Sequence, residues 1–149
     1  MADTKAQVEA EKWIRENKLP RLYGQTFRRR SLLLKSKGEF KFDAVSDDGN
    51  IVALISTSSG INAKGELATG SIMKIRSDIY WFMMLEQQPN RKLLVFTEQS
   101  MIDIINEEKK KGRFPSEFEI VKIKLPQELA DRVIESKEVA SREVSPNNT

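Results

Sequence analysis

Residues 38–58, GEFKFDAVSDDGNIVALISTS, constrain the fold of this chain more than any other segment. Polar and apolar residues alternate between positions 40 and 46, which is the period of a strand with two different faces. Asp48 and Gly49 form a pair typical of a tight hairpin turn. Residues 51–58 carry no charge and begin apolar on both sides, as expected for a central strand covered on each face. The segment therefore predicts a hairpin at the centre of a sheet.

The same alternation assigns faces to the first strand of this hairpin. It places Phe40, Phe42 and Ala44 on one face and Lys41, Asp43 and Val45 on the other. Asp43 thus sits on the sheet between apolar neighbours, where an unpaired carboxylate is costly. We expect either a metal ion or a basic side chain to compensate its charge.

The rest of the chain alternates between helix-like and strand-like periods. The segment 6–17 predicts an amphipathic helix with Val8, Trp13 and Ile14 on its apolar side, ending before Pro20. Further strands are predicted at 27–37, 91–97 and 118–125, and further helices at 71–88, 99–111 and 127–143. Thr69 or Ser71 is expected to cap the helix that follows the hairpin.

This order of elements predicts an α/β (α+β) fold with a mixed central sheet. An antiparallel meander is followed by a β-α-β crossover, with helices on both faces. The length of 149 residues favours a single domain. We expect its core over residues 6–126, a C-terminal helix over 127–143 and a frayed tail over 144–149.

The predicted order is similar to the α-β-β-β-α-β core of the PD-(D/E)XK, or restriction endonuclease-like, nuclease superfamily. In that superfamily an Asp on one strand is followed across a hairpin by an acid-X-Lys triplet. Asp43 matches the first Asp, whereas Ala53 and Ile55 stand at the acid and lysine positions. A shifted register would place Leu54 and Ser56 there instead. The resemblance implies a nuclease-like domain with a degenerate signature, which binds nucleic acid without necessarily cutting it.

Cleavage of a phosphodiester needs a divalent cation held by carboxylate oxygens and a positive group near the attacked phosphate. Asp43 is the candidate Mg²⁺ ligand, and Asp43 and Lys74 are the candidate catalytic residues. The resemblance implies that the helix after the hairpin can supply the missing charge, through Lys74 with Asp78 on the same helical face. It also implies that Glu9 or Glu11 of the first helix can reach the sheet, although surface exposure of both is the favoured expectation. The structural alternatives are a salt bridge for Asp43 and an ordinary i,i+4 pair for Lys74.

Composition narrows the chemistry further. Cysteine and histidine are both absent, which excludes disulfides, thiolate catalysis and His- or Cys-based zinc sites. Any catalysis must rest on carboxylates, lysine, hydroxyls or a hard metal ion. The loop from Gly60 to Ser71 superficially resembles a phosphate-binding loop. Glu66 and Leu67 follow its second glycine where Lys and Ser/Thr are required, so a nucleotide hydrolase is rejected.

Basic residues concentrate near the first predicted strand, although the net charge is only +3. Such a patch suits a phosphate backbone, because each neutralised phosphate releases counterions. An ordinary solvated surface is the competing explanation. The candidate nucleic-acid-binding residues are Arg28, Arg29, Arg30, Lys35, Lys37, Ser58 and Lys64. DNA is expected more than RNA, with a nucleic-acid-associated protein as the other partner.

A second class of function stays open on sequence alone. The chain could be an assembly subunit that uses the fold as a scaffold and pairs through its long helix or its C-terminal extension, for example as a homodimer. No apolar run reaches membrane-spanning length and the N-terminus lacks a signal-peptide core. We therefore expect a cytoplasmic protein with no membrane partner.

Overall fold

The computed structural model describes residues 5–144, with side chains as far as Glu138. Within that range one mixed sheet holds five strands in the order β1-β2-β3-β4-β5. The strands are β1 Phe27–Leu33, β2 Glu39–Ser46, β3 Ile51–Ser56, β4 Arg91–Phe96 and β5 Phe118–Lys122. The first three are antiparallel, whereas β3, β4 and β5 are parallel. The predicted meander and crossover are confirmed.

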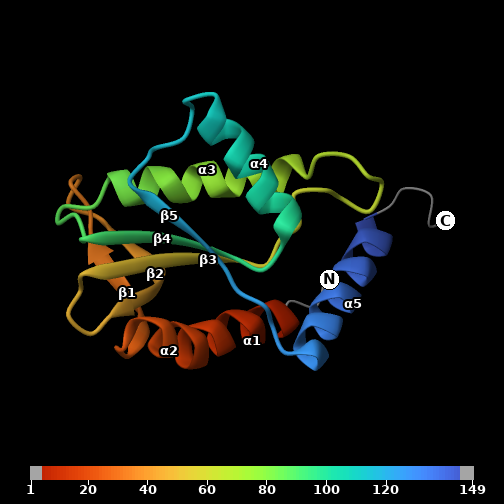
Figure 1. The fold of residues 1–149 in the computed structure, drawn as a ribbon, viewed down its shortest axis with the longest axis horizontal. Helices are drawn as coiled ribbons and strands as arrows, with labels where there is room; N and C mark the ends of the chain where they lie inside the picture. Colours follow the sequence, from red (N-terminus) through yellow and green to blue (C-terminus); the bar gives the residue numbers. More distant parts are fainter. Residues whose placement is uncertain (1–4, 145–149) are drawn as a thin grey trace.

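Helices cover both faces of this sheet (Figure 1). The helical elements are α1 Lys5–Trp13, the π-helix η1 Ile14–Lys18, α2 Leu19–Tyr23, α3 Thr69–Met83, α4 Gln99–Lys110 and α5 Gln127–Val144. Helices α1, α2 and α5 lie on one face, and α3 and α4 lie on the other. Across residues 5–144, no helix combines the length and apolarity that crossing a bilayer requires.

Two apolar clusters fill the space between the layers. The cluster under α1 joins Ala10, Ile14 and Val133 to strand residues such as Ala53 and Leu93. The cluster under α3 contains a row of rings in which Phe82 lies 5.2 Å from Phe42 and 5.1 Å from Phe118, centroid to centroid. Both faces of β3 are therefore buried, as its uncharged sequence predicts.

The N-terminal helical region extends further than predicted. Pro20 was expected to follow the helix, but the chain stays helical to Tyr23. Pro20 lies in the first turn of α2, where a missing N–H costs little, and the π-helical turn has already displaced the hydrogen-bond ladder. Gly24, with φ at 70°, ends the helix. Val8 is exposed, since Ala6, Ala10 and Ile14 form the buried face instead.

The cap predicted for α3 is also wrong. Thr69 and Ser71 lie inside the helix, and Ala68 occupies the N-cap position without a side-chain hydrogen bond. The apolar residues of α3 are only partly buried. Ile75 and Phe82 are buried, whereas Met83 is exposed because it lies on the solvent side of the helix.

Strand β2 contains a β-bulge that the sequence pattern does not predict. Arg28 pairs with Val45 and Arg30 with Phe42. One residue lies between the paired positions of β1, whereas two residues, Asp43 and Ala44, lie between those of β2. The extra residue reverses the side-chain alternation. Ala44 therefore packs in the cluster under α1, while Phe42 and Val45 share the cluster under α3. The predicted grouping of Ala44 with Phe42 is wrong for this reason.

Close packing requires a glycine at position 60. Its N–H donates to Ser100 Oγ at 2.9 Å, and its carbonyl accepts from the Ala68 N–H at 2.8 Å. A Cβ at this position would lie 2.4 Å from Ile104 Cδ1 and 3.0 Å from the Ser100 carbonyl oxygen. The loop after β3 is therefore seated directly on α4.

Replacing Gly60 with alanine is expected to destabilise the fold by about 1–3 kcal/mol, because the new methyl group overpacks this contact. Urea unfolding followed by circular dichroism measures the change. Gly70→Ala is the matched control, since Gly70 is helical and has no atom within 4 Å of the added Cβ. Equal midpoints for the two variants would show that the loop can move away from α4 without cost.

The C-terminal helix closes the face that carries α1. Arg132 forms an ion pair with Glu9 at 2.7 Å, and Ser136 Oγ donates to Gln7 Oε1 at 3.3 Å. Leu129 and Val133 complete the cluster under α1. Of the tail predicted over 144–149, Val144 ends α5 and the remaining residues lie outside the described range.

Candidate functional site around Asp43

Asp43 occupies the bulge of β2, at the point where β2 and β3 separate. The two strands pair only through Ala44 with Ala53 and Val45 with Val52. Beyond these pairs the Asp43 carboxylate takes the place of a backbone carbonyl of β2 as hydrogen-bond acceptor. Its Oδ2 accepts from the Ile55 N–H at 2.8 Å. Asp43 therefore has a structural task, which is to satisfy a donor of the central strand.

Glu11 of α1 is the carboxyl group that meets Asp43. Arg15 contacts both residues, and the two carboxyl groups lie close enough for their charges to interact. Burial raises the pKa of Glu11 and the negative charge of Asp43 adds to the effect, while Arg15 and Arg29 oppose it. Glu11 thus lies against the sheet, although surface exposure was the favoured expectation for both acids of the first helix. Glu9 instead pairs with Arg132 at the surface.

The π-helical turn η1 contributes the main cation of this site. Arg15 donates through Nη1 to Glu11 Oε1 at 3.1 Å and to the Asp43 carbonyl oxygen at 3.2 Å. Arg29 of β1 lies 3.8 Å from the same Glu11 oxygen. Local π turns occur often at functional sites, and this one places a guanidinium between a helix and a bulged strand.

Asp78 approaches from α3 on the opposite side of the sheet. Its side chain is only 7% exposed and accepts from Lys74 Nζ at 3.4 Å. Burial raises the pKa of Asp78 to about 6, against the favourable charge of Lys74, and the negative charge of Asp43 raises it further. Lys74 is therefore paired with Asp78, one turn away on α3. The described contacts of Lys74 do not include Asp43.

We name these six residues the Asp43 cluster: Glu11, Arg15, Arg29, Asp43, Lys74 and Asp78. It holds three acidic and three basic groups, so its formal charges cancel when all are ionised. A Mg²⁺ site needs several converging oxygen ligands and usually an excess of negative charge. No three acidic side chains within the described residues converge as a metal ion would require. The residues present do not fit the Mg²⁺ ion that the resemblance implies, and we propose no metal-dependent step.

The positions of the missing triplet support the same reading. Ala53 and Ile55 of β3 are buried in the cluster under α1, and the Ile55 N–H donates to the Asp43 carboxylate. Leu54 is buried in the cluster under α3. Core side chains thus fill the space where the nuclease pattern has an acid and a lysine.

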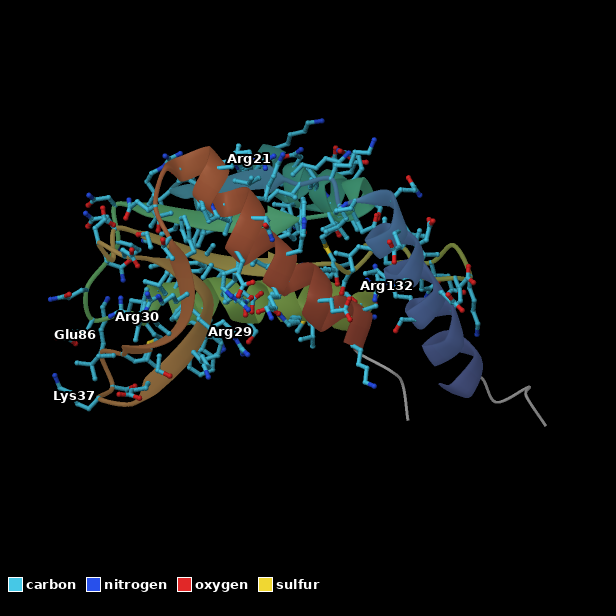
Figure 2. The ribbon with its side chains drawn as sticks, turned by 90° about the horizontal axis from the view of Figure 1, so that it is seen from below. Arg21, Arg29, Arg30, Lys37, Glu86 and Arg132 are labelled. Carbon is cyan, nitrogen blue, oxygen red and sulfur yellow. The ribbon has the colours of Figure 1, made fainter. Side chains whose placement is uncertain are left out.

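The predicted nucleic-acid-binding residues fall into separate places. Strand alternation turns Arg29 towards Glu11, whereas Arg28 and Arg30 lie on the other face of β1. Ser58 and Lys64 belong to the loop after β3, at the far end of the molecule from Arg30 and Lys37 (Figures 1 and 2). The Ser58 N–H donates to Ser56 Oγ at 3.2 Å, and the Lys64 N–H donates to Asn62 Oδ1 at 2.9 Å. Ser58 and Lys64 therefore do not extend the basic patch of β1.

What remains of that patch surrounds the β1–β2 hairpin. We call it the hairpin patch, and it consists of Arg28, Arg30, Lys35 and Lys37. Lys37 lies in the turn at a φ of 74° and reaches Glu86 at 4.0 Å. Within the described part of the chain, the side chains of Arg28, Arg30 and Lys35 have no acidic partner. These three cations are free to meet an anionic ligand.

Sequence reasoning missed Lys137 of α5. Its ammonium group donates to the Thr57 carbonyl oxygen and lies 3.4 Å from Glu98 Oε1, so it joins α5 to the carboxyl ends of β3 and β4. Burial lowers the pKa of Lys137. No sequence signal marks this contact, because the C-terminal helix is polar and its packing against distant strands has no local pattern.

Comparison with known proteins adds nothing to this geometry. No protein-family model, curated protein or solved structure matches the chain.

Proposed function

We propose that this chain is a nucleic-acid-binding domain of nuclease-like architecture, acting in the cytoplasm, whose former cleavage site serves as a structural centre. The single observation that carries the proposal is the hairpin patch, in which three exposed cations have no acidic partner among the described residues. DNA is the proposed partner ahead of RNA.

The Asp43 cluster supports the second half of the proposal. Its acids gather around the point where the bulged strand separates from β3, and each is bound to a cation or to backbone. Removing one partner of a buried charge pair leaves the other charge uncompensated, so such pairs oppose rearrangement of helix and sheet. Asp43 then joins β3 to η1, through the Ile55 N–H and Arg15, while phosphate groups bind elsewhere.

Edge-strand protection is the competing explanation for the hairpin patch. Charged side chains on an outer strand prevent it from pairing with another chain. Two features favour a ligand as well: Lys35 extends the charge beyond the strand into the turn, and Arg30 borders a pocket. Edge protection requires neither.

Removing the cations of Arg28 and Arg30 together is expected to weaken DNA binding and to reduce its salt dependence. Each lost phosphate contact lowers the slope of log K against log salt by about 1, so Arg28→Gln/Arg30→Gln should lose about 2. Fluorescence anisotropy with labelled single- and double-stranded DNA and RNA, between about 50 and 200 mM salt, measures this slope.

Arg21→Gln/Lys124→Gln is the matched control, because it removes two exposed cations outside the patch. An equal loss in both variants would show that total charge, not the hairpin patch, drives binding. The same mixtures with added Mg²⁺ or Mn²⁺ test cleavage. Cleavage that disappears in Asp43→Ala would contradict the structural role of the cluster and establish an active nuclease.

An assembly subunit is the second candidate function, and one surface favours it. Met73, Tyr80 and Met83 are 52%, 55% and 53% exposed along one side of α3. An apolar stripe of this kind suits a protein contact, including a homodimer. Association through it would persist as salt is raised, and sedimentation of the protein at increasing concentration distinguishes it from nucleic-acid binding.

A further inference from the structure

A pocket of about 550 Å³ opens beside the hairpin patch. It lies between β1, the β2–β3 turn and the connection from α3 to β4. Its floor is aliphatic and formed by side chains of the core: Leu32, Val45, Val52 and Leu85. Its rim is polar and contains Arg30, Asp47, Asn50, Glu86 and Gln87. Figure 2 shows Arg30 and Glu86 at the same end of the molecule.

Other hydrogen bonds hold the pocket in shape. Asp48 Oδ1 accepts from Ser46 Oγ at 2.8 Å and from the Asn50 N–H at 2.9 Å, which fixes the turn. Gln88 Nε2 donates to the Leu85 carbonyl oxygen at 2.9 Å and to the Phe82 carbonyl oxygen at 3.2 Å. The wall and the turn are therefore largely formed before any ligand binds.

The rim presents unused polar groups. Within the described residues, the side chains of Arg30, Asp47, Asn50 and Gln87 make no hydrogen bond or ion pair. Two amides, one carboxylate and one guanidinium thus surround an apolar floor. Donors and acceptors at the edge of an apolar surface match a flat heterocycle with polar edges, and the volume is in the range of roughly 300–1,000 Å³ found for small-ligand sites.

A second pocket shows why this one is preferred. The groove between α3 and α4 is also lined by aliphatic side chains, but its charged groups are used by one another. Arg76 lies 3.4 Å and Arg113 2.8 Å from Glu108 oxygens. The pocket beside the hairpin patch, by contrast, has rim side chains without a partner among the described residues.

We propose that the pocket takes one unpaired nucleobase of the bound nucleic acid. The aliphatic floor contacts the face of the base, the amides of Asn50 and Gln87 meet its polar edge, and Arg28 and Arg30 hold the flanking phosphates. Single-stranded and extrahelical bases are read in this way, by contact with their faces and hydrogen bonds to their edges. The inference rests on the proposed function and narrows its substrate to nucleic acid with a bulged or single-stranded position.

The test compares three DNA duplexes that differ at one position: fully paired, with one bulged base, and with a bulged abasic sugar. The wild-type protein should bind the bulged base about fivefold or more tightly than either other duplex, since the aliphatic floor removes one face of the base from water. Amide chemical shifts of Asn50 and Gln87 should change only with the bulged base.

Asn50→Ala/Gln87→Ala removes the edge contacts and leaves both arginines in place. This variant should lose the preference for the bulged base and keep the affinity for paired duplex. Asn106→Ala, an exposed amide on α4, is the control and should keep the preference. A preference that survives in Asn50→Ala/Gln87→Ala would place the base elsewhere and overturn the inference.

The remaining outcomes separate the two proposals. Equal binding of all three duplexes by the wild-type protein would reject the base pocket and leave nucleic-acid binding intact. Failure to bind any duplex or single strand would reject both.

Discussion

Replacing Phe82 with alanine is expected to lower the free energy of unfolding by about 3–5 kcal/mol. The Phe82 side chain is fully buried and lies between the rings of Phe42 and Phe118. Its loss leaves a cavity where α3 meets the sheet, and the facing strands cannot collapse into it without breaking their own pairing. Since small domains are stable by only about 5–15 kcal/mol, the variant should be close to unfolding.

Chemical denaturation followed by tryptophan fluorescence measures this change. Met83→Ala is the matched control, because Met83 is the next residue of α3 and is 53% exposed. Its expected change is within about 0.5 kcal/mol. A small effect of Phe82→Ala would mean that α3 does not rest on the sheet through this row of rings.

Asp78 makes the stability of the fold depend on pH. The pKa of its carboxyl is 3.8 in the absence of the fold and about 6 within it, mainly because the group is buried. Folding therefore favours the protonated form, so the associated stabilisation is complete below about pH 4 and is lost as the pH rises towards 6. A difference of about 2 pKa units corresponds to about 3 kcal/mol.

Asp78→Asn is expected to remove that dependence. The stability of the variant minus that of the wild type should fall by about 3 kcal/mol between about pH 7 and pH 4, because the wild type regains its stability on protonation. Urea unfolding at a series of pH values measures the difference. In Lys74→Met the window should move to higher pH, since Lys74 opposes the rise in the pKa of Asp78. A difference that stays flat with pH would show that Asp78 is solvated in solution.

The sequence was sufficient for the order of the elements because each strand and helix carries its own period. The buried strand β3, with no charge from Ile51 to Ser56, and the Asp48-Gly49 turn placed the hairpin correctly. The predictions that were wrong concern features that depend on two segments of the chain together. The bulge at Asp43 arises from the pairing of β1 with β2. Pro20 can lie inside the helical region because the π-helical turn precedes it.

The candidate site was predictable only as a list of residue types. Asp43 stood out because a carboxylate on an apolar strand needs compensation, but the groups around it come from three distant elements, β3, α1 and α3, and the Ile55 N–H is the donor that its carboxylate accepts. Arg15 and Glu11 look like ordinary surface residues of an amphipathic helix. The three consecutive arginines looked like one patch, yet strand geometry sends Arg29 to the other face of the sheet.

The order of the sheet has a consequence for how this chain reaches its fold. Every described strand pairs with its neighbour in sequence. The β1–β2 and β2–β3 connections are short, so these antiparallel pairs close at low entropic cost, whereas the parallel pairs need the longer crossovers through α3 and α4. The contact between α5 and α1 spans much more of the chain, since the hydrogen bond from Ser136 to Gln7 joins residues 129 positions apart. During synthesis the meander can form early. The apolar side of α1 stays partly uncovered until α5 has been made. Docking of α5 would then be the late, slow step, and its delay would leave Ala10 and Ile14 open to association with other chains.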